Sequence, residues 1–156
     1  MGEWLQSFRL QVQRNLVALI SLAVALTGLA YNTWRNETTE TQRNVRLAAF
    51  EVVRTLGELQ QTVHLVTYGG ESSPRLVIIG WGHVELVRDM SPIVSRASGE
   101  AGTDLFRTWE ADISELELWQ SGDPQAQERA VAGEQRVSAQ ISTVRHAVLE
   151  ALNELE

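Results

Sequence analysis

An uncharged, mainly apolar run near the amino terminus, residues 15–34, is the clearest pattern in the sequence. A helix of about 20 residues is about 30 Å long, which matches the hydrocarbon core of a bilayer. The leucines, isoleucine and valines of the run favour insertion, and no acidic or basic side chain opposes them. Aromatic side chains typical of a membrane interface flank the run, namely Trp4, Phe8, Tyr31 and Trp34. We therefore predict a transmembrane helix over residues 15–34, after a short amphipathic tail, residues 1–14.

A removed leader is the alternative to a permanent anchor. Gly28-Leu29-Ala30 has the small-x-small form of a signal-peptide cleavage site. However, the apolar run is longer than most leader segments, and a tail of 14 residues with Arg9 and Arg14 suits an anchor better. We expect the segment to stay uncleaved.

The charges that flank the run are nearly balanced, so they orient it weakly. Arg9, Arg14 and the α-amine precede it, and three arginines follow it, namely Arg35, Arg43 and Arg46. An amino-terminal anchor of this kind usually leaves its short tail in the cytoplasm. We therefore expect an inner-membrane protein with its carboxyl-terminal domain in the bacterial periplasm.

A heptad pattern follows the membrane segment. Apolar residues recur at alternating spacings of four and three, namely Val45, Ala49, Val52, Leu56, Leu59, Val63 and Val66. Such spacing predicts a long amphipathic helix with one buried stripe. No proline occurs before position 74, so the membrane helix is expected to continue directly into this one, until Gly69-Gly70 ends it.

The next segment gives mixed signals. Ser73 and Pro74 are typical of a helix start, but residues 76–79 have strand propensity, and Gly80 and Gly82 weaken a helix. Even so, a stripe with helical spacing runs through the segment: Leu76, Ile79, His83, Leu86, Met90 and Ile93. No second strand offers a partner. We predict a helix from about Trp81 to a kink or end at Pro92, and leave residues 69–80 open between helix and loop.

Two further helices are expected. Residues 97–102 (ASGEAG) suggest a loop, after which Thr103 would cap a helix with Asp104 in its first turn. The apolar stripe of that helix is Phe106, Trp109, Ile113 and Leu116. Asp123 and Pro124 then mark a new start. The last helix carries its stripe at Val137, Ile141, Val144, Val148, Ala151 and Leu155.

Together these segments predict an all-α protein. Amphipathic helices joined by short loops pack as antiparallel neighbours, since each must bury its apolar stripe. Residues 36–156 are therefore expected to form a four-helix, or three-long-helix, antiparallel bundle behind the transmembrane helix. At the level of fold alone, this plan resembles the sensory regions of bacterial transmembrane receptors.

Composition excludes several classes of function. The chain has no cysteine, which removes disulfides, thiolate zinc sites and cysteine nucleophiles. It has 20 acidic residues against 13 basic ones, a net charge of −7, which argues against nucleic-acid binding. Phosphate-binding loops, nucleophile elbows, HExxH and EF-hand patterns are also missing from the sequence. We therefore predict a protein that is not an enzyme and holds no cofactor.

Histidines and clustered acids are the remaining candidates for site chemistry. His64, His83 and His146 fall on three different helices, and bundle metal sites are built from facing helices. No Glu-x-x-His pair accompanies them, so we expect a core or boundary role for His83 and surface positions for the other two. Acidic residues also gather on the third bundle segment, where we expect a solvated helix surface rather than a catalytic pair: Glu110, Asp112, Glu115 and Glu117.

Tryptophans mark possible contacts with a partner or ligand, because tryptophan is enriched at binding hot spots. The candidate residues are Trp81, His83, Trp109 and Trp119. Trp109 fits the core stripe. Trp81 and Trp119 lie near glycines, a position that permits more exposure, but we expect Trp81 to pack in the core, with contact to a partner or ligand as the alternative. Ser21-x3-Ala25, with Gly28 nearby, also permits close pairing of two membrane helices in a homodimer.

These observations favour a non-enzymatic, single-pass membrane protein. Its helical bundle would act as an interaction or scaffold subunit for another membrane or periplasmic protein. The alternative is a small-molecule-sensing periplasmic bundle without its own output domain, with Trp81, His83 and Trp109 near a pocket. A third hypothesis is a metal- or haem-binding bundle built on the three histidines.

Overall fold

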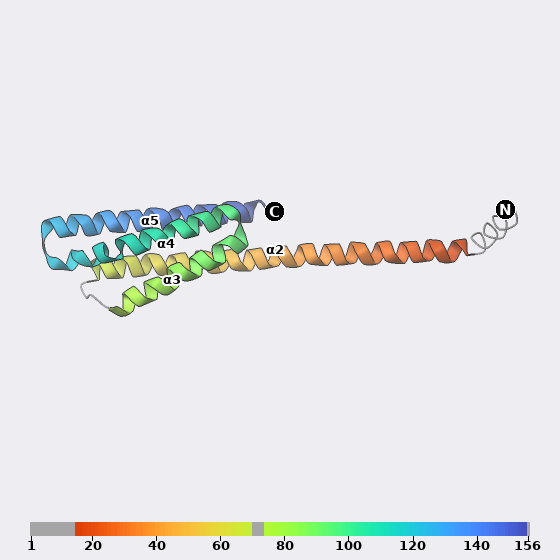
Figure 1. Ribbon diagram of the computed structural model, residues 1–156, viewed down its shortest axis with the longest axis horizontal. Helices are drawn as coiled ribbons and strands as arrows, with labels where there is room; N and C mark the ends of the chain where they lie inside the picture. Colours follow the sequence, from red (N-terminus) through yellow and green to blue (C-terminus); the bar gives the residue numbers. More distant parts are fainter. Residues whose placement is uncertain (1–14, 70–73, 156) are drawn as a thin grey trace, which may run out of the picture. The chain divides into compact units, whose positions relative to one another are not determined.

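A computed structural model describes residues 15–69 and 74–155 of the chain. Within these residues the elements are all helical (Figure 1): α2 (Leu16–Tyr68), α3 (Pro74–Val94), α4 (Arg96–Leu116), the 3-10 helix η1 (Glu117–Ser121) and α5 (Pro124–Asn153). The predicted all-α fold is confirmed. The chain divides into two compact units, Met1–Thr41 and Gln42–Glu156.

In the first unit, the described residues belong to the amino-terminal part of α2. Every side chain from Leu16 to Thr41 is exposed, although eight leucines, isoleucines and valines lie among them: Leu16, Val17, Leu19, Ile20, Leu22, Val24, Leu26 and Leu29. The hydroxyl of Thr27 donates to the carbonyl of Ala23 at 2.8 Å, which satisfies this polar group inside the apolar run. This part of α2 is long and apolar enough to cross a membrane.

The second unit is a helical bundle. The second half of α2 lies alongside α3, α4 and α5, and successive helices run antiparallel (Figure 1). The heptad stripe predicted for α2 is confirmed, because its members from Ala49 to Val66 are buried. The stripe of α5 is confirmed as well, from Val137 to Ala151. The large residues of these two helices supply much of the hydrophobic core.

The stripe predicted for α3 is wrong by about one position. The buried face of α3 is Gly80, Val84, Val87, Ser91 and Val94, whereas Ile79 and Ile93 of the predicted stripe are 36% and 49% exposed. Gly80 explains the difference. A Cβ at this position would overlap the indole ring of Trp109 on α4. A seam that begins with glycine and contains serine carries too little hydrophobic signal to be read from the sequence.

The loop predicted for residues 97–102 is also wrong. Helix α4 begins at Arg96, and Ser95 caps it by accepting a hydrogen bond from Ser98 N at 3.1 Å. Thr103 is not the cap but lies inside the helix, and Asp104 therefore falls outside the first turn. The two glycines of this segment serve close packing between helices. A Cβ at Gly99 would lie 3.1 Å from Pro92, and one at Gly102 would lie 3.1 Å from Ser91.

The remaining boundaries agree largely with the sequence. Helix α3 is already formed from Pro74, so residues 74–80 are helical, and Pro92 lies inside the helix two residues before its end. The predicted cap Ser73 lies outside the described residues. Between η1 and α5, Gly122 adopts a positive φ of 72°. Asp123 then accepts a hydrogen bond from Ala126 N at 3.0 Å, which confirms it as the predicted cap of α5.

The contact between Gly80 and Trp109 leads to a stability prediction. We expect Gly80→Ala to destabilise the bundle by about 1–3 kcal/mol, because the added methyl overpacks the seam between α3 and α4. Gly82→Ala is the matched control, since nothing lies within 4 Å of its added Cβ. That variant should gain up to about 1 kcal/mol from helix propensity. Urea unfolding of the full chain in mild detergent, followed by near-ultraviolet circular dichroism, measures both, and equal stabilities would contradict the close contact.

Candidate functional site

An aromatic cluster joins α3 to α4. The ring of Trp81 meets Phe106 and Trp109 edge-on, with centroid distances of 5.6 and 6.4 Å. The guanidinium of Arg88 lies over the Phe106 ring at 4.5 Å, in a cation–π contact. Trp109 is fully buried, as its place in the predicted stripe requires, and Trp81 is half-buried and packs against the core, as expected. Trp109 belongs to the hydrophobic core and Trp81 packs against it, so the two tryptophans serve the core.

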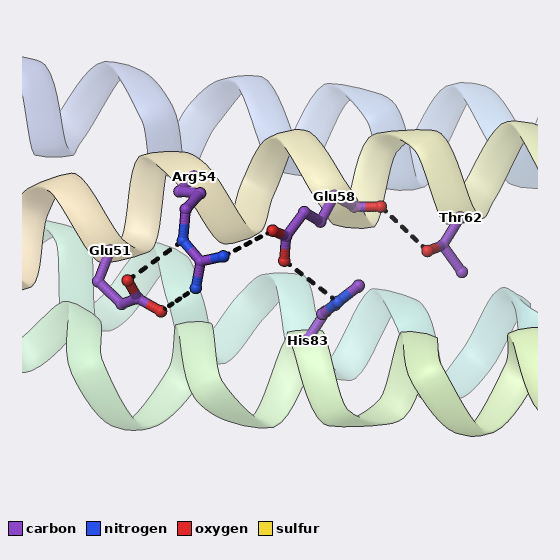
Figure 2. A network of polar contacts seen from close by, with 5 residues as sticks. All are labelled: Glu51, Arg54, Glu58, Thr62 and His83. Atoms are coloured by element: carbon purple, nitrogen blue, oxygen red, sulfur yellow. Dashed lines mark hydrogen bonds and ion pairs between the residues drawn. The ribbon is translucent and has the colours of Figure 1, made fainter.

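His83 belongs to a polar network on the surface between α2 and α3 (Figure 2). Its Nε2 lies 3.5 Å from Oε2 of Glu58, and Oε1 of Glu58 accepts a hydrogen bond from Arg54 at 2.8 Å. Arg54 also binds Glu51, and this hydrogen bond lowers the pKa of Glu51 below its usual value. The side chain of His83 is 20% exposed. It therefore occupies the boundary position that the sequence predicted and connects α3 to the charged face of α2.

Trp119 lies near the carboxyl-terminal end of α2, beside a hollow in the surface. Its ring packs edge-on against Tyr68, the last residue of α2, with 5.0 Å between ring centroids. Its backbone carbonyl accepts a hydrogen bond from Gln127 at 3.3 Å. A hollow of about 420 Å³, open to solvent, is lined by Trp119, Gln127, Glu128, Val131, Ala132 and Gln135. Of the four predicted contact residues, Trp119 is the one that lines this hollow.

A second polar network ties α2 to α5 and was missed by the sequence analysis. Gln60 donates to the hydroxyl of Ser138 at 2.8 Å, and that hydroxyl donates to Glu134 at 2.6 Å. Nε2 of His64 lies 3.4 Å from the same carboxylate. Gln60 and His64 are four residues apart on α2, and Glu134 and Ser138 are four apart on α5. This matched spacing was the available signal, but it becomes visible only once the two helices are known to be neighbours.

Asp112 corrects the expectation of a solvated acidic surface. It is buried, with 7% of the residue exposed, and both of its carboxylate oxygens accept hydrogen bonds from Arg136 of α5, at 2.9 and 2.7 Å. Such a two-point contact is strong and directional. Donation of these hydrogen bonds to the Asp112 carboxylate raises the pKa of Arg136, so the arginine stays charged. Glu115 also faces α5, with its carboxylate 3.7 Å from Arg129.

The histidines do not converge. Each lies beside a different glutamate: His64 beside Glu134, His83 beside Glu58, and His146 beside Glu150. Across residues 15–69 and 74–155, no group of three histidine, aspartate or glutamate side chains is placed to hold a metal ion. The geometry therefore does not favour the hypothesis of a metal or haem site built on the histidines.

Two of the four predicted membrane-interface residues lie in the described part of the chain. Tyr31 and Trp34 are both exposed on α2, with their ring centroids 6.2 Å apart. Such a pair suits the amphipathic region where lipid headgroups meet water. Trp4 and Phe8 lie outside the described residues.

Comparison with known proteins adds no relative. No protein-family model, curated protein or solved structure matches the chain.

The surroundings of Tyr68 predict a measurable titration. Burial, and then the negative charge of Glu134, raise the pKa of Tyr68 above its ordinary value. Because a raised pKa favours the neutral phenol in the folded state, its contribution to stability is present below about pH 10 and is lost as the pH rises through the higher folded value. Ultraviolet titration of a Tyr31→Phe variant, which leaves Tyr68 as the single tyrosine, measures this pKa.

Glu134→Gln separates the two causes. We expect it to lower the pKa of Tyr68 only in part, because burial is the larger cause. Glu150→Gln on the same helix is the control and should leave the titration unchanged. A pKa of Tyr68 at or below the ordinary tyrosine value in the parent protein would contradict this description of its surroundings.

Proposed function

We propose that the protein is a single-pass membrane protein whose helical bundle acts as a non-enzymatic interaction or scaffold subunit. The observation that carries the proposal is the exposure of apolar side chains along the amino-terminal part of α2. Its eight leucine, isoleucine and valine side chains are 48–77% exposed, yet the same helix supplies a core stripe of the bundle. Apolar side chains gain about 25 cal/mol for each Å² removed from water, so this surface requires a cover that lipid provides.

A binding role suits the bundle better than catalysis. Several side chains with chemical capacity are engaged across contacts between helices, as in the pairs of Asp112 with Arg136 and His64 with Glu134. A general acid or base must instead be free to reach a substrate in a cleft. What the bundle offers to other molecules is therefore its surface.

We further propose that the bundle lies on the periplasmic side of a bacterial inner membrane. The arginines on the two sides of the apolar run are nearly balanced, so charge does not hold the bundle in the cytoplasm. A short amino-terminal tail is the segment most easily retained on the cytoplasmic side, and long domains cross largely regardless of charge.

Sensing of a small molecule is the second candidate function, and the hollow beside Trp119 favours it. The cluster of Trp81 and Trp109 does not, because the two rings pack against each other and Trp109 is fully buried. A ligand that binds only the folded protein raises its melting temperature. Under this candidate, we expect Trp119→Ala to abolish a ligand-induced rise in the melting temperature of the full chain, while Trp81→Phe keeps it.

Membrane retention tests the leading proposal. The full chain, expressed in a bacterial host, should stay with membranes after salt and alkaline washes and be released by detergent. Replacing Leu22 and Val24 by arginine should impair insertion, because each charge costs roughly 2.5–3.5 kcal/mol near the middle of the membrane. Arginine at the exposed Ala139 of α5 is the control and should leave retention unchanged.

Two results would contradict the proposal. One is recovery of the mature chain from the aqueous fraction without its first thirty or so residues, since the apolar run would then be a leader. The other, which concerns orientation alone, is protection of the bundle when protease is added to cells with a permeable outer membrane.

A further inference from the structure

Leucine and alanine are ordered along the apolar run of α2. Four leucines follow one another at spacings of three, four and three residues, and we call them the leucine stripe: Leu19, Leu22, Leu26 and Leu29. This spacing places them on one side of the helix. The four alanines of the run each directly precede or follow one of these leucines: Ala18, Ala23, Ala25 and Ala30. Small side chains that flank larger ones let a second helix approach closely, whereas contact with lipid requires no such order.

The heptad phase of the leucine stripe continues along the sequence. Counted onward from Leu29 by fours and threes, the next positions are Thr33, Asn36, Glu40, Arg43, Leu47 and Phe50. In the second unit, Leu47 and Phe50 are 58% and 65% exposed, although the neighbouring positions Ala49 and Val52 are buried in the bundle. Two parts of α2 therefore expose large apolar side chains in the same heptad phase.

The small residues Ser21 and Gly28 mark another side of the helix on which two copies could pair. Three further steps of seven residues lead from Gly28 to Ala49, which the bundle buries. A seam in this phase would therefore meet, in the second unit, a face of α2 that the other helices already cover. The phase of the leucine stripe meets no such obstacle, because it leads to the exposed Leu47 and Phe50.

We propose that the leucine stripe of α2 pairs in parallel with the leucine stripe of a second copy of this chain, and that the contact continues through Asn36, Leu47 and Phe50. Two helices anchored by the same segment in one membrane lie parallel and at the same depth, so equal positions meet. Slight supercoiling keeps a heptad stripe in contact with its partner. The inference rests on the membrane anchor of the proposed function and goes beyond it, since it identifies a partner and a face.

The charges in this phase favour a second copy over a helix of uniform charge. Glu40 and Arg43 occupy successive positions, both are exposed, and neither has an ion-pair partner among residues 15–69 and 74–155. In a parallel pair, Glu40 of each copy lies one layer from Arg43 of the other copy, so the charges of the two layers offset each other. A purely basic or purely acidic partner helix would match only one of the two layers.

Disulfide crosslinking tests which side of α2 meets the second copy. The chain has no cysteine, so a single introduced cysteine reports on a single contact. Asn36→Cys and Glu40→Cys lie in the phase of the leucine stripe, whereas Arg35→Cys and Thr38→Cys lie in the phase of Gly28 and its neighbours; all four positions are exposed. Each full-length variant is purified, placed in vesicles of zwitterionic lipid at a low ratio of protein to lipid, and oxidised mildly. Maleimide labelling corrects for differences in thiol reactivity.

We expect at least about fivefold more disulfide-linked dimer from cysteine at positions 36 and 40 than at positions 35 and 38, because the bond needs close Cβ atoms. Higher yields at positions 35 and 38 would show pairing through Ser21 and Gly28 and overturn the proposal. Equal yields at all four positions, high or low, would also overturn it, since no side of the helix would then be preferred.

Leucine variants locate the contact inside the apolar run. In the Glu40→Cys background, Leu22→Ala with Leu26→Ala should lower the yield of dimer at least about fivefold, because the packing between helices is lost. Val17→Ala with Val24→Ala is the matched control, since these valines are also exposed but lie away from the leucine stripe. An unchanged yield in the leucine variant would contradict the stripe as the contact.

A second pair of variants tests the part of the contact that lies in the bundle unit. Leu47→Ser with Phe50→Ser should lower the yield in the Glu40→Cys background at least about threefold, because exposed apolar anchors are removed. Ile78→Ser with Leu149→Ser, at exposed apolar positions of α3 and α5, is the control and should leave the yield unchanged. Equal effects of the two changes would confine the contact to the apolar run and contradict its continuation.

Membrane retention after an alkaline wash, measured for every variant, separates this proposal from the proposed function. A chain that stays in the membrane but shows no preference among the cysteine positions refutes only the pairing. Loss of the parent chain from the membrane refutes the anchor. Circular dichroism verifies that each variant keeps its helical fold.

Discussion

The whole molecule depends on how one helix buries its apolar surface. Helix α2 runs for 53 residues without a break, but its two parts present different problems. From Leu16 to Trp34 apolar residues occur on all sides, and this part of the helix is long and apolar enough to cross a membrane. From Val45 to Val66 they form a single stripe, which neighbouring helices cover. The change in pattern along the helix therefore distinguishes a candidate membrane span from the stripe that the bundle buries.

Polar contacts between the bundle helices specify which faces meet. Hydrophobic burial is non-directional, so apolar stripes alone permit several rotations of each helix. Asp112 and Arg136 fix α4 against α5 through two hydrogen bonds, and the network of Gln60, Ser138 and Glu134 fixes α2 against α5. Exposed members of these contacts contribute little to stability. These contacts instead fix how each helix is rotated against its neighbour. A rotated arrangement would leave the buried carboxylate of Asp112 without its partner, which is costly.

The size of the residues in each contact between helices determines how much of the fold can be read from the sequence. The stripes of α2 and α5 consist largely of valine, leucine and isoleucine, so their periodicity was readable. The contact between α3 and α4 uses glycine and serine, which carry little hydrophobic signal and were taken for a loop. The same limit applied to the candidate site. Trp109 was placed correctly from its own helix, whereas the pairs of His64 with Glu134 and Asp112 with Arg136 depend on which helices become neighbours.

Helix α3 buries a different face from the one that its apolar periodicity predicts. The predicted stripe, from Leu76 to Ile93, has regular helical spacing, and yet the bundle buries the adjacent face instead. Gly80 explains this choice, since the bulky ring of Trp109 packs directly where a side chain at that position would otherwise lie. The isoleucines of the predicted stripe are consequently left at the surface by the very contact that joins α3 to α4. The close approach of Trp109 to Gly80 therefore determines which face of α3 is buried, and the larger isoleucine side chains remain exposed.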